Sequence, residues 1–229
     1  MCFQSPYVPE GWRSRCTCFI DGSCVMIAHD DIPFRLIIAA ELVAMGGVRA
    51  YYSVSRTAHG SPGRRAESAW FTAILAVLAL LHFGAVLAYL ADPSLSKGSG
   101  FEVAEPIRWT VIVVSSSGAA GVIWAAVSLG ASYSPLLRVA QERVVVTAGP
   151  YRWIRHPLYA FWLPLMAGWG VTTRNWLVLA TGTAILVLMV IRAPREEAMM
   201  LNAFGKSYRQ YMLHTGCFVP RLRSAGGGE

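Results

Sequence analysis

The sequence has little charge and almost no lysine. Charged residues make up 14% of the 229 residues, and lysine occurs only at Lys97 and Lys206. Hydrophobic residues make up 55%, and the mean hydropathy is +0.44. Soluble domains carry about a quarter charged residues. This composition therefore excludes an ordinary soluble domain and predicts a membrane protein with several spanning segments.

Signatures of other protein classes are also missing. No Gly-x-Gly-x-x-Gly sequence follows a strand pattern, which excludes a Rossmann dinucleotide-binding domain. The net charge of +7 is not gathered in a basic patch with interleaved aromatic residues, so no nucleic-acid partner is predicted. Residues 1–31 lack the apolar core and cleavage site of a secretory leader, and we expect none there.

Residues 1–31 contain four of the five cysteines, namely Cys2, Cys16, Cys18 and Cys24. They lack a Cys-x-x-Cys pair and clustered histidines, so no metal site is predicted. A stable disulfide among them requires that this end of the chain lies outside the cytosol. The segment is polar and irregular, and we expect a disordered tail.

Five apolar segments follow, at residues 34–53, 69–91, 107–130, 158–172 and 175–193. A spanning helix needs about 20 residues, so the fourth and fifth segments are short, and we expect them to form a tight hairpin. The predicted fold is all-α: a polytopic membrane helical bundle with about five transmembrane helices and a C-terminal cytosolic amphipathic helix.

The basic residues predict the orientation of the bundle, because cytosolic loops carry an excess of Lys and Arg. Fourteen of the 20 basic residues lie on one side: Arg49, Arg56, Arg64, Arg65, Arg138, Arg143, Arg152, Arg155, Arg192, Arg195, Lys206, Arg209, Arg221 and Arg223. Six lie on the other: Arg13, Arg15, Arg35, Lys97, Arg108 and Arg174. The first side is predicted to be cytosolic, with the N-terminus outside and the C-terminus inside.

Two polar segments flank the fourth and fifth apolar segments. Residues 149–159 contain a glycine, two prolines, two tyrosines, two arginines and a histidine, and residues 192–197 end in two glutamates. The ordered pattern is Gly149, Tyr151, Arg155 to Tyr159, Glu196-Glu197, Phe204-Gly205, Tyr208 and Tyr211. This set resembles the signature of the isoprenylcysteine carboxyl methyltransferase family, integral-membrane enzymes that use S-adenosylmethionine (SAM) and are related to the phospholipid methyltransferases.

The resemblance implies a three-part chain: a tail at 1–31, helices 1–3 with their connections at 32–142, and a methyltransferase signature region at 143–223. It implies that SAM is bound at the cytosolic face by Val145, Val146, Tyr151, His156, Pro157, Leu158, Tyr159 and Glu196. The valines would lie against the adenine, and Glu196 would meet the cofactor's ammonium group. Arg192 is the implied catalytic residue and would bind the substrate carboxylate, with Glu197 also at the substrate.

The implied reaction is methylation of a carboxylate on an isoprenylcysteine-like or other lipidic substrate. A carboxylate with an ordinary pKa near 4 is already ionised at pH 7 and needs no base. Methylation of a phospholipid amine or a small thiol would need one. A membrane sterol-type reductase would use NADPH instead, with Arg143, Arg152 and Arg155 available for its extra phosphate. A non-catalytic scaffold would leave the ordered polar set unexplained.

Several intramembrane residues receive a structural interpretation. We expect Glu41 and His82 to make hydrogen bonds between neighbouring helices, and the small residues from Ser115 to Gly121 to permit close helix packing. Residues 195–213 are predicted to form a helix on the cytosolic face, with Pro194 as a bend if this helix continues from the fifth apolar segment. Phe161 stands where many relatives have a glycine, so the hairpin or the substrate entrance is expected to differ there.

Overall fold

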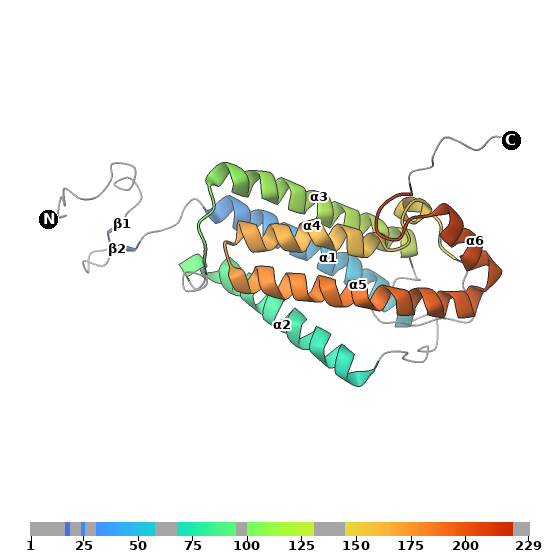
Figure 1. Cartoon of the computed structure of the whole chain (residues 1–229). Coiled ribbons are helices and arrows are strands. Elements are labelled where there is room, and N and C mark those ends of the chain that lie inside the picture. The colour runs from blue at the N-terminus through green and yellow to red at the C-terminus, as the bar shows by residue number, and fades with distance from the viewer. Residues whose placement is uncertain are drawn as a thin grey trace.

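The computed structural model describes residues 17–18, 24–25, 31–57, 68–94, 100–130 and 145–221. Within this part of the chain the fold is a helical bundle with one short antiparallel strand pair, β1 (Thr17–Cys18) and β2 (Cys24–Val25). The helices are α1 (Ile32–Thr57), α2 (Ala69–Ala91), α3 (Glu105–Leu129), the 3-10 turn η5 (Gly149–Arg152), α4 (Pro157–Thr172), α5 (Trp176–Phe204) and α6 (Lys206–His214). Figure 1 shows α1 to α5 side by side, with α6 and η5 at one end of the bundle.

Three of the described helices, α2, α3 and α5, are long and apolar enough to cross a membrane. The other two stand where spanning segments were predicted but differ in character. α4 has 16 residues, or about 24 Å of helix, against a hydrocarbon core of roughly 30 Å. α1 has 26 residues but carries Arg35, Glu41 and Arg49.

The centre of the bundle is the contact of α4 with α3 and α5, between which it lies in Figure 1. A Cβ atom on Gly118 of α3 would come within 2.9 Å of both the Phe161 carbonyl oxygen and the Leu165 amide nitrogen. The two helix backbones therefore touch, and only glycine fits at this crossing. This confirms the small-residue packing predicted for α3.

The Phe161 ring fits against α3 because the facing residues of α3 are small. A Cβ on Gly121 would overlap the Phe161 ring, so the ring fills the space that a side chain at position 121 would take. The glycine needed for close approach is thus supplied by α3, and the large residue by α4. The departure from the common pattern at Phe161 leaves the α3–α4 contact tightly packed.

A network of buried polar groups closes the end of the bundle opposite η5. Arg108 is fully buried, and its guanidinium donates to the carboxylate of Asp31 at 2.5 Å and to the carbonyl oxygen of Thr172 at 3.1 Å. The Tyr89 hydroxyl and the Arg174 guanidinium also reach Asp31, each at 3.3 Å. Since a buried charge requires a partner, this network ties the ends of α1, α2 and α3 to the α4–α5 turn.

The two ionisable residues predicted to link helices do so around one tryptophan. The Glu41 carboxylate on α1 accepts hydrogen bonds from the Ser116 hydroxyl of α3 and from Trp169 Nε1 of α4, both at 2.6 Å. The His82 ring on α2 lies 3.1 Å from the carbonyl oxygen of Val178 on α5 and stacks on Trp169, centroid to centroid 6.1 Å. The predicted interhelical hydrogen bonds are confirmed.

The helix predicted over residues 195–213 is divided between two elements, because α5 continues through Pro194 to Phe204 and α6 forms the rest. Arg192 and Ala193 are buried where they meet the rest of the bundle, and this packing offsets the hydrogen bond that Pro194 removes from the helix. The break comes instead at Gly205, whose φ of +53° is a left-handed conformation that favours glycine. α6 then begins at Lys206.

Substitution at the α3–α4 crossing tests this packing. Gly118→Val should lower the stability of the detergent-solubilised protein by about 1–3 kcal/mol relative to Gly84→Val, because the new side chain meets backbone atoms. Gly84 is the matched control, since it also lies inside a helix and its Cβ would have no neighbour within 4 Å. Thermal unfolding followed by circular dichroism measures the difference, and equal midpoints for the two variants would refute the close contact.

Candidate functional site

The signature segment begins with a turn held against the end of α3. Gly149 has a φ of +58°, and a Cβ there would overlap the Ser128 side chain and approach Trp124 Nε1 to 3.3 Å. Glycine is required both by the left-handed backbone and by the lack of room. The turn buries the Tyr151 side chain and leaves Arg152 exposed, stacked over Trp153 at 4.7 Å from the ring centroid. Arg152 and Trp153 thus have the exposure expected of interfacial anchors.

The segment then starts α4 at Pro157, with His156 as the residue before the helix. Proline is favoured at this first helical position, where the missing amide would have no intrahelical partner. The His156 ring is 9% exposed and stacks on the Tyr159 ring, with centroids 5.4 Å apart. This stacking fixes the direction of both side chains.

The C-terminal segment after α6 pairs with the signature segment, which the sequence did not reveal. Arg155 and His156 donate their backbone amides to the carbonyl oxygens of Gly216 and Cys217 at 2.8 and 3.0 Å, and Gly216 donates in turn to Trp153. The Tyr211 hydroxyl donates to the Tyr151 carbonyl oxygen at 2.6 Å. Burial raises the pKa of Tyr211 to about 12, so this hydroxyl keeps its proton at neutral pH.

Glu196 is the centre of the first side-chain cluster. It accepts a hydrogen bond from the Tyr159 hydroxyl at 2.8 Å, pairs with Arg192 Nε at 2.9 Å and lies 3.5 Å from His156 Nδ1. Arg192 is 5% exposed, so its interaction with Glu196 is a buried ion pair and not a surface pair of little energetic value. Arg192 and Glu196 are four residues apart and share a face because α5 is continuous.

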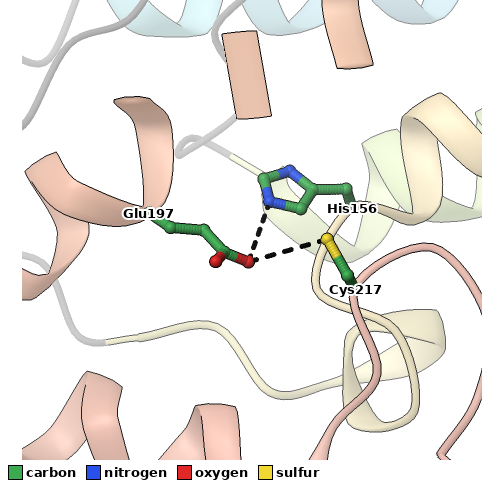
Figure 2. A group of neighbouring side chains, drawn as sticks. All are labelled: His156, Glu197 and Cys217. Atoms are coloured by element: carbon green, nitrogen blue, oxygen red, sulfur yellow. Dashed lines mark hydrogen bonds and ion pairs between the residues drawn. The ribbon is translucent and has the colours of Figure 1, made fainter. Parts of the chain in front are cut away.

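Glu197 is the centre of a second cluster on the other side of the histidine. Its Oε1 atom lies 2.7 Å from Arg155 Nε, 3.4 Å from His156 Nε2 and 3.8 Å from Cys217 Sγ. Figure 2 shows His156 and Cys217 both directed at this oxygen. Arg155 also donates to the carbonyl oxygens of Thr215 and Met212.

The charge of Glu197 affects its neighbours in opposite ways. Burial alone would lower the pKa of Arg155, but the hydrogen bond and the charge of Glu197 outweigh it and raise that pKa above its ordinary value. Burial and the same negative charge raise the pKa of the Cys217 thiol. Arg155 is therefore a fixed cation, and Cys217 is a protonated thiol at neutral pH.

An apolar cavity of about 480 Å³ lies between the helices at the same end of the bundle. All five long helices contribute to its wall, including Leu42 and Met45 of α1, Phe83 of α2 and Trp162 of α4. Arg192 also lines it. One guanidinium thus belongs both to the polar cluster around Glu196 and to the wall of an apolar cavity.

The structure brings together most of the residues expected at the site. Arg192, Glu196, Tyr159 and His156 form one cluster, and Pro157 and Leu158 begin the helix that carries it. Val145 and Val146 are half-buried just before η5. Glu197 is directed to Arg155 and Cys217 and is not among the residues that line the cavity. Arg143 lies outside the described residues, as do Cys2 and Cys16 of the tail.

Comparison with known proteins identifies the same segment. Residues 109–202 match the model of the isoprenylcysteine carboxyl methyltransferase (ICMT) family. The resemblance to this family is confirmed. The matched stretch runs from α3 to the end of α5, so it contains η5, the start of α4 and both glutamates.

Individual known proteins match this chain over part of their length. A protein-S-isoprenylcysteine O-methyltransferase of Tribolium castaneum is 25% identical over 183 residues, which is 66% of this chain and 65% of the relative. A methanethiol S-methyltransferase of Pseudomonas deceptionensis is 35% identical over 81 residues, 34% of this chain and 29% of the relative. The solved structure of a eukaryotic intramembrane Ras methyltransferase ICMT gives a TM-score of 0.47 at 24% identity, covering 67% of this chain and 53% of that one. The chain thus spans less than two thirds of the length of each.

Proposed function

We propose that this chain is an integral-membrane, SAM-dependent methyltransferase that methylates the carboxylate of a lipidic substrate, such as an isoprenylcysteine. The position of Arg192 carries the proposal. It pairs with the buried Glu196 and also lines an apolar cavity, so a group held by Arg192 would have an apolar tail in the cavity and its polar head beside Glu196, His156 and Tyr159. The match to the ICMT family supports the reaction class.

The described residues fit a bound SAM molecule. Glu196 is a buried carboxylate surrounded by Tyr159, His156 and Arg192, and an ammonium group would find an acceptor there. The amino end of α4 favours the cofactor's carboxylate, and the half-buried Val145 and Val146 offer an apolar surface to the adenine. When bound, SAM would supply an electrophilic methyl group on a sulfonium.

The side chains of this site would position the acceptor, and none has to remove a proton. Arg192 can hold both oxygens of a carboxylate in its planar fork, a geometry that lysine does not offer. Burial excludes the water that would otherwise solvate the attacking oxygen. The rate gain would come from holding the reacting atoms in line.

The charge of the cavity wall favours an anionic acceptor over a cationic one. Arg49 and Arg192 are the charged residues among those that line it, and both are basic. A carboxylate on a long apolar molecule satisfies this arrangement, whereas a phospholipid amine would bring a positive charge towards two arginines. For this reason we place carboxyl methylation ahead of amine methylation.

A thiol acceptor is the second candidate, and the match to a methanethiol S-methyltransferase favours it. A small thiol would fill little of the apolar cavity of about 480 Å³, so the size of this cavity favours a larger, lipidic acceptor. The NADPH-reductase alternative loses one of the three arginines named for the extra phosphate, because Arg155 is engaged by Glu197 and by two backbone carbonyl oxygens.

We further propose that the five helices α1 to α5 are embedded in the bilayer and that the end carrying η5 and α6 faces the cytosol. α4 is short but packs between α3 and α5, and these longer neighbours span the remaining thickness. The excess of basic residues at this end supports the orientation.

Cysteine accessibility tests this orientation at exposed positions on either side of α2. In a chain whose native cysteines are replaced by serine, Ser68→Cys should react with a membrane-impermeant maleimide only from the cytosolic side. Ser94→Cys should react only from the outside. The opposite pattern would move the site away from the cytosol.

The cofactor assignment predicts a loss of SAM affinity in two variants. Glu196→Gln keeps the shape of the side chain but removes its charge, and His156→Ala removes the stacked ring. Each should weaken SAM binding about tenfold to hundredfold, because a hydrogen bond to a charged group contributes roughly 1.5–3 kcal/mol. Isothermal titration calorimetry on the purified protein measures this, with Glu102→Gln and His214→Ala as controls at exposed positions. Unchanged SAM affinity in both Glu196→Gln and His156→Ala would refute the assignment of these residues to the SAM site.

The chemical nature of the product tests the substrate class. Membranes containing the protein are incubated with methyl-labelled SAM, and the labelled product is treated with base, which releases volatile methanol from esters only. We expect base-labile label, and Arg192→Lys should reduce its formation about tenfold to hundredfold with little change in SAM affinity. Base-stable label would favour the thiol or amine acceptor.

A further inference from the structure

His156, Glu197 and Cys217 come from three separate parts of the chain and converge on one point (Figure 2). His156 precedes α4, Glu197 lies on α5, and Cys217 lies in the segment after α6. One ligand-type atom of each side chain, a ring nitrogen, a carboxylate oxygen and a sulfur, lies within 4.8 Å of the other two. This grouping combines the three donor types that zinc proteins use.

The separations match the edges of a metal-centred tetrahedron. With metal–sulfur bonds of about 2.3 Å and metal–nitrogen or metal–oxygen bonds of about 2.0–2.1 Å, tetrahedral angles place nitrogen and oxygen about 3.3 Å apart and sulfur and oxygen about 3.6 Å apart. The observed distances are 3.4 Å from His156 Nε2 to Glu197 Oε1 and 3.8 Å from Cys217 Sγ to the same oxygen. These two separations agree with the tetrahedral values to within about 0.2 Å, and the third pair, His156 and Cys217, has ligand atoms within 4.8 Å of each other.

The residues around the three ligands are placed as outer-shell partners are in metal sites. A metal-bound histidine usually gives its other ring nitrogen to a carboxylate, and a metal-bound carboxylate is itself hydrogen-bonded. Here His156 Nδ1 lies 3.5 Å from Glu196, and Arg155 Nε lies 2.7 Å from Glu197. His156 Nε2 is buried and makes no hydrogen bond within the described part of the chain. The ring nitrogen that faces the cluster is therefore a polar atom without a bonded partner, and a metal ion would supply one.

We infer that His156, Glu197 and Cys217 bind a thiophilic divalent cation of the Zn²⁺ class. On binding, the Cys217 S–H bond breaks, its proton leaves to solvent and a metal–sulfur bond forms. The charges of the cation, the thiolate and the Glu197 carboxylate then sum to zero, which suits a site that is largely buried. Three protein ligands leave a fourth position open, and the sulfur ligand selects soft or borderline cations over Mg²⁺ and Ca²⁺.

Cobalt provides the test, because Co²⁺ substitutes for Zn²⁺ and is coloured. The full chain is purified in detergent with Cys2, Cys16, Cys18 and Cys24 replaced by serine, so that Cys217 is the one thiol left. Addition of Co²⁺ should produce a near-ultraviolet thiolate-to-metal absorption and the strong visible bands of a four-coordinate ion, saturating at one ion per chain. The absence of the thiolate band in this parent would overturn the proposal.

Variants then assign the ligands. Cys217→Ser should abolish the thiolate band, and Glu197→Gln should weaken Co²⁺ affinity by at least about tenfold, since even outer-shell changes cost that much. His214→Ala is the matched control and should change neither. Unchanged Co²⁺ affinity in both Cys217→Ser and Glu197→Gln would show that the ion binds elsewhere.

X-ray absorption on the Zn²⁺-loaded parent adds a measurement that needs no variant. We expect one sulfur at about 2.3 Å with nitrogen or oxygen at about 2.0–2.1 Å, and a shell without sulfur would refute the site. Cys217 has no part in the proposed SAM site, so Cys217→Ser should bind SAM normally. Failure of the metal site is thereby separated from failure of the proposed enzymatic function.

Discussion

The backbone contact between α3 and α4 is the constraint on which the site depends. Because Gly118 has no side chain, the backbone of α4 at Phe161 and Leu165 lies directly against α3. This contact places the start of α4 beside the end of α3. There the turn at Gly149 rests on Ser128 and Trp124. His156 and Tyr159 are thereby fixed relative to α5, which packs on the other side of α4.

The two consecutive glutamates on α5 separate the site into two chemically different halves. Successive residues of a helix point about 100° apart, so Glu196 is directed to Arg192 and Tyr159, and Glu197 to Arg155 and Cys217. His156 stands between them, with Nδ1 near Glu196 and Nε2 near Glu197. The His156 ring is thus a side chain that both halves share.

The sequence was most informative where the determining interactions are local. Long apolar runs predicted the hairpin at 158–172 and 175–193, close to the observed α4 and the start of α5. The pairing of Arg192 with Glu196 was not predicted, because it depends on α5 continuing through Pro194. The end of α5 was missed because the effect of Pro194 depends on how Arg192 and Ala193 are buried. Propensity alone favours a break at proline over one at Gly205.

The cluster around Glu197 could not be predicted, because it depends on a long-range pairing. Cys217 is brought to His156 by the bridge between Ile154 and Gly216 and by the hydrogen bond from the His156 amide to the Cys217 carbonyl oxygen. No sequence pattern in residues 215–217 predicts this pairing. The hydrogen bonds of Arg155 to Met212 and Thr215 are of the same kind. A search restricted to the signature segments would have overlooked the cysteine.

The backbone bridge at Gly216 also has a consequence for limited proteolysis. Arg155 and His156 donate their backbone amides to the carbonyl oxygens of Gly216 and Cys217, which follow α6. A protease that cuts between α6 and Gly216 would leave the contacts among α1 to α5 in place but would release the residues that hold these two amides. The nicked protein would therefore keep its helical bundle and lose the fixed position of His156.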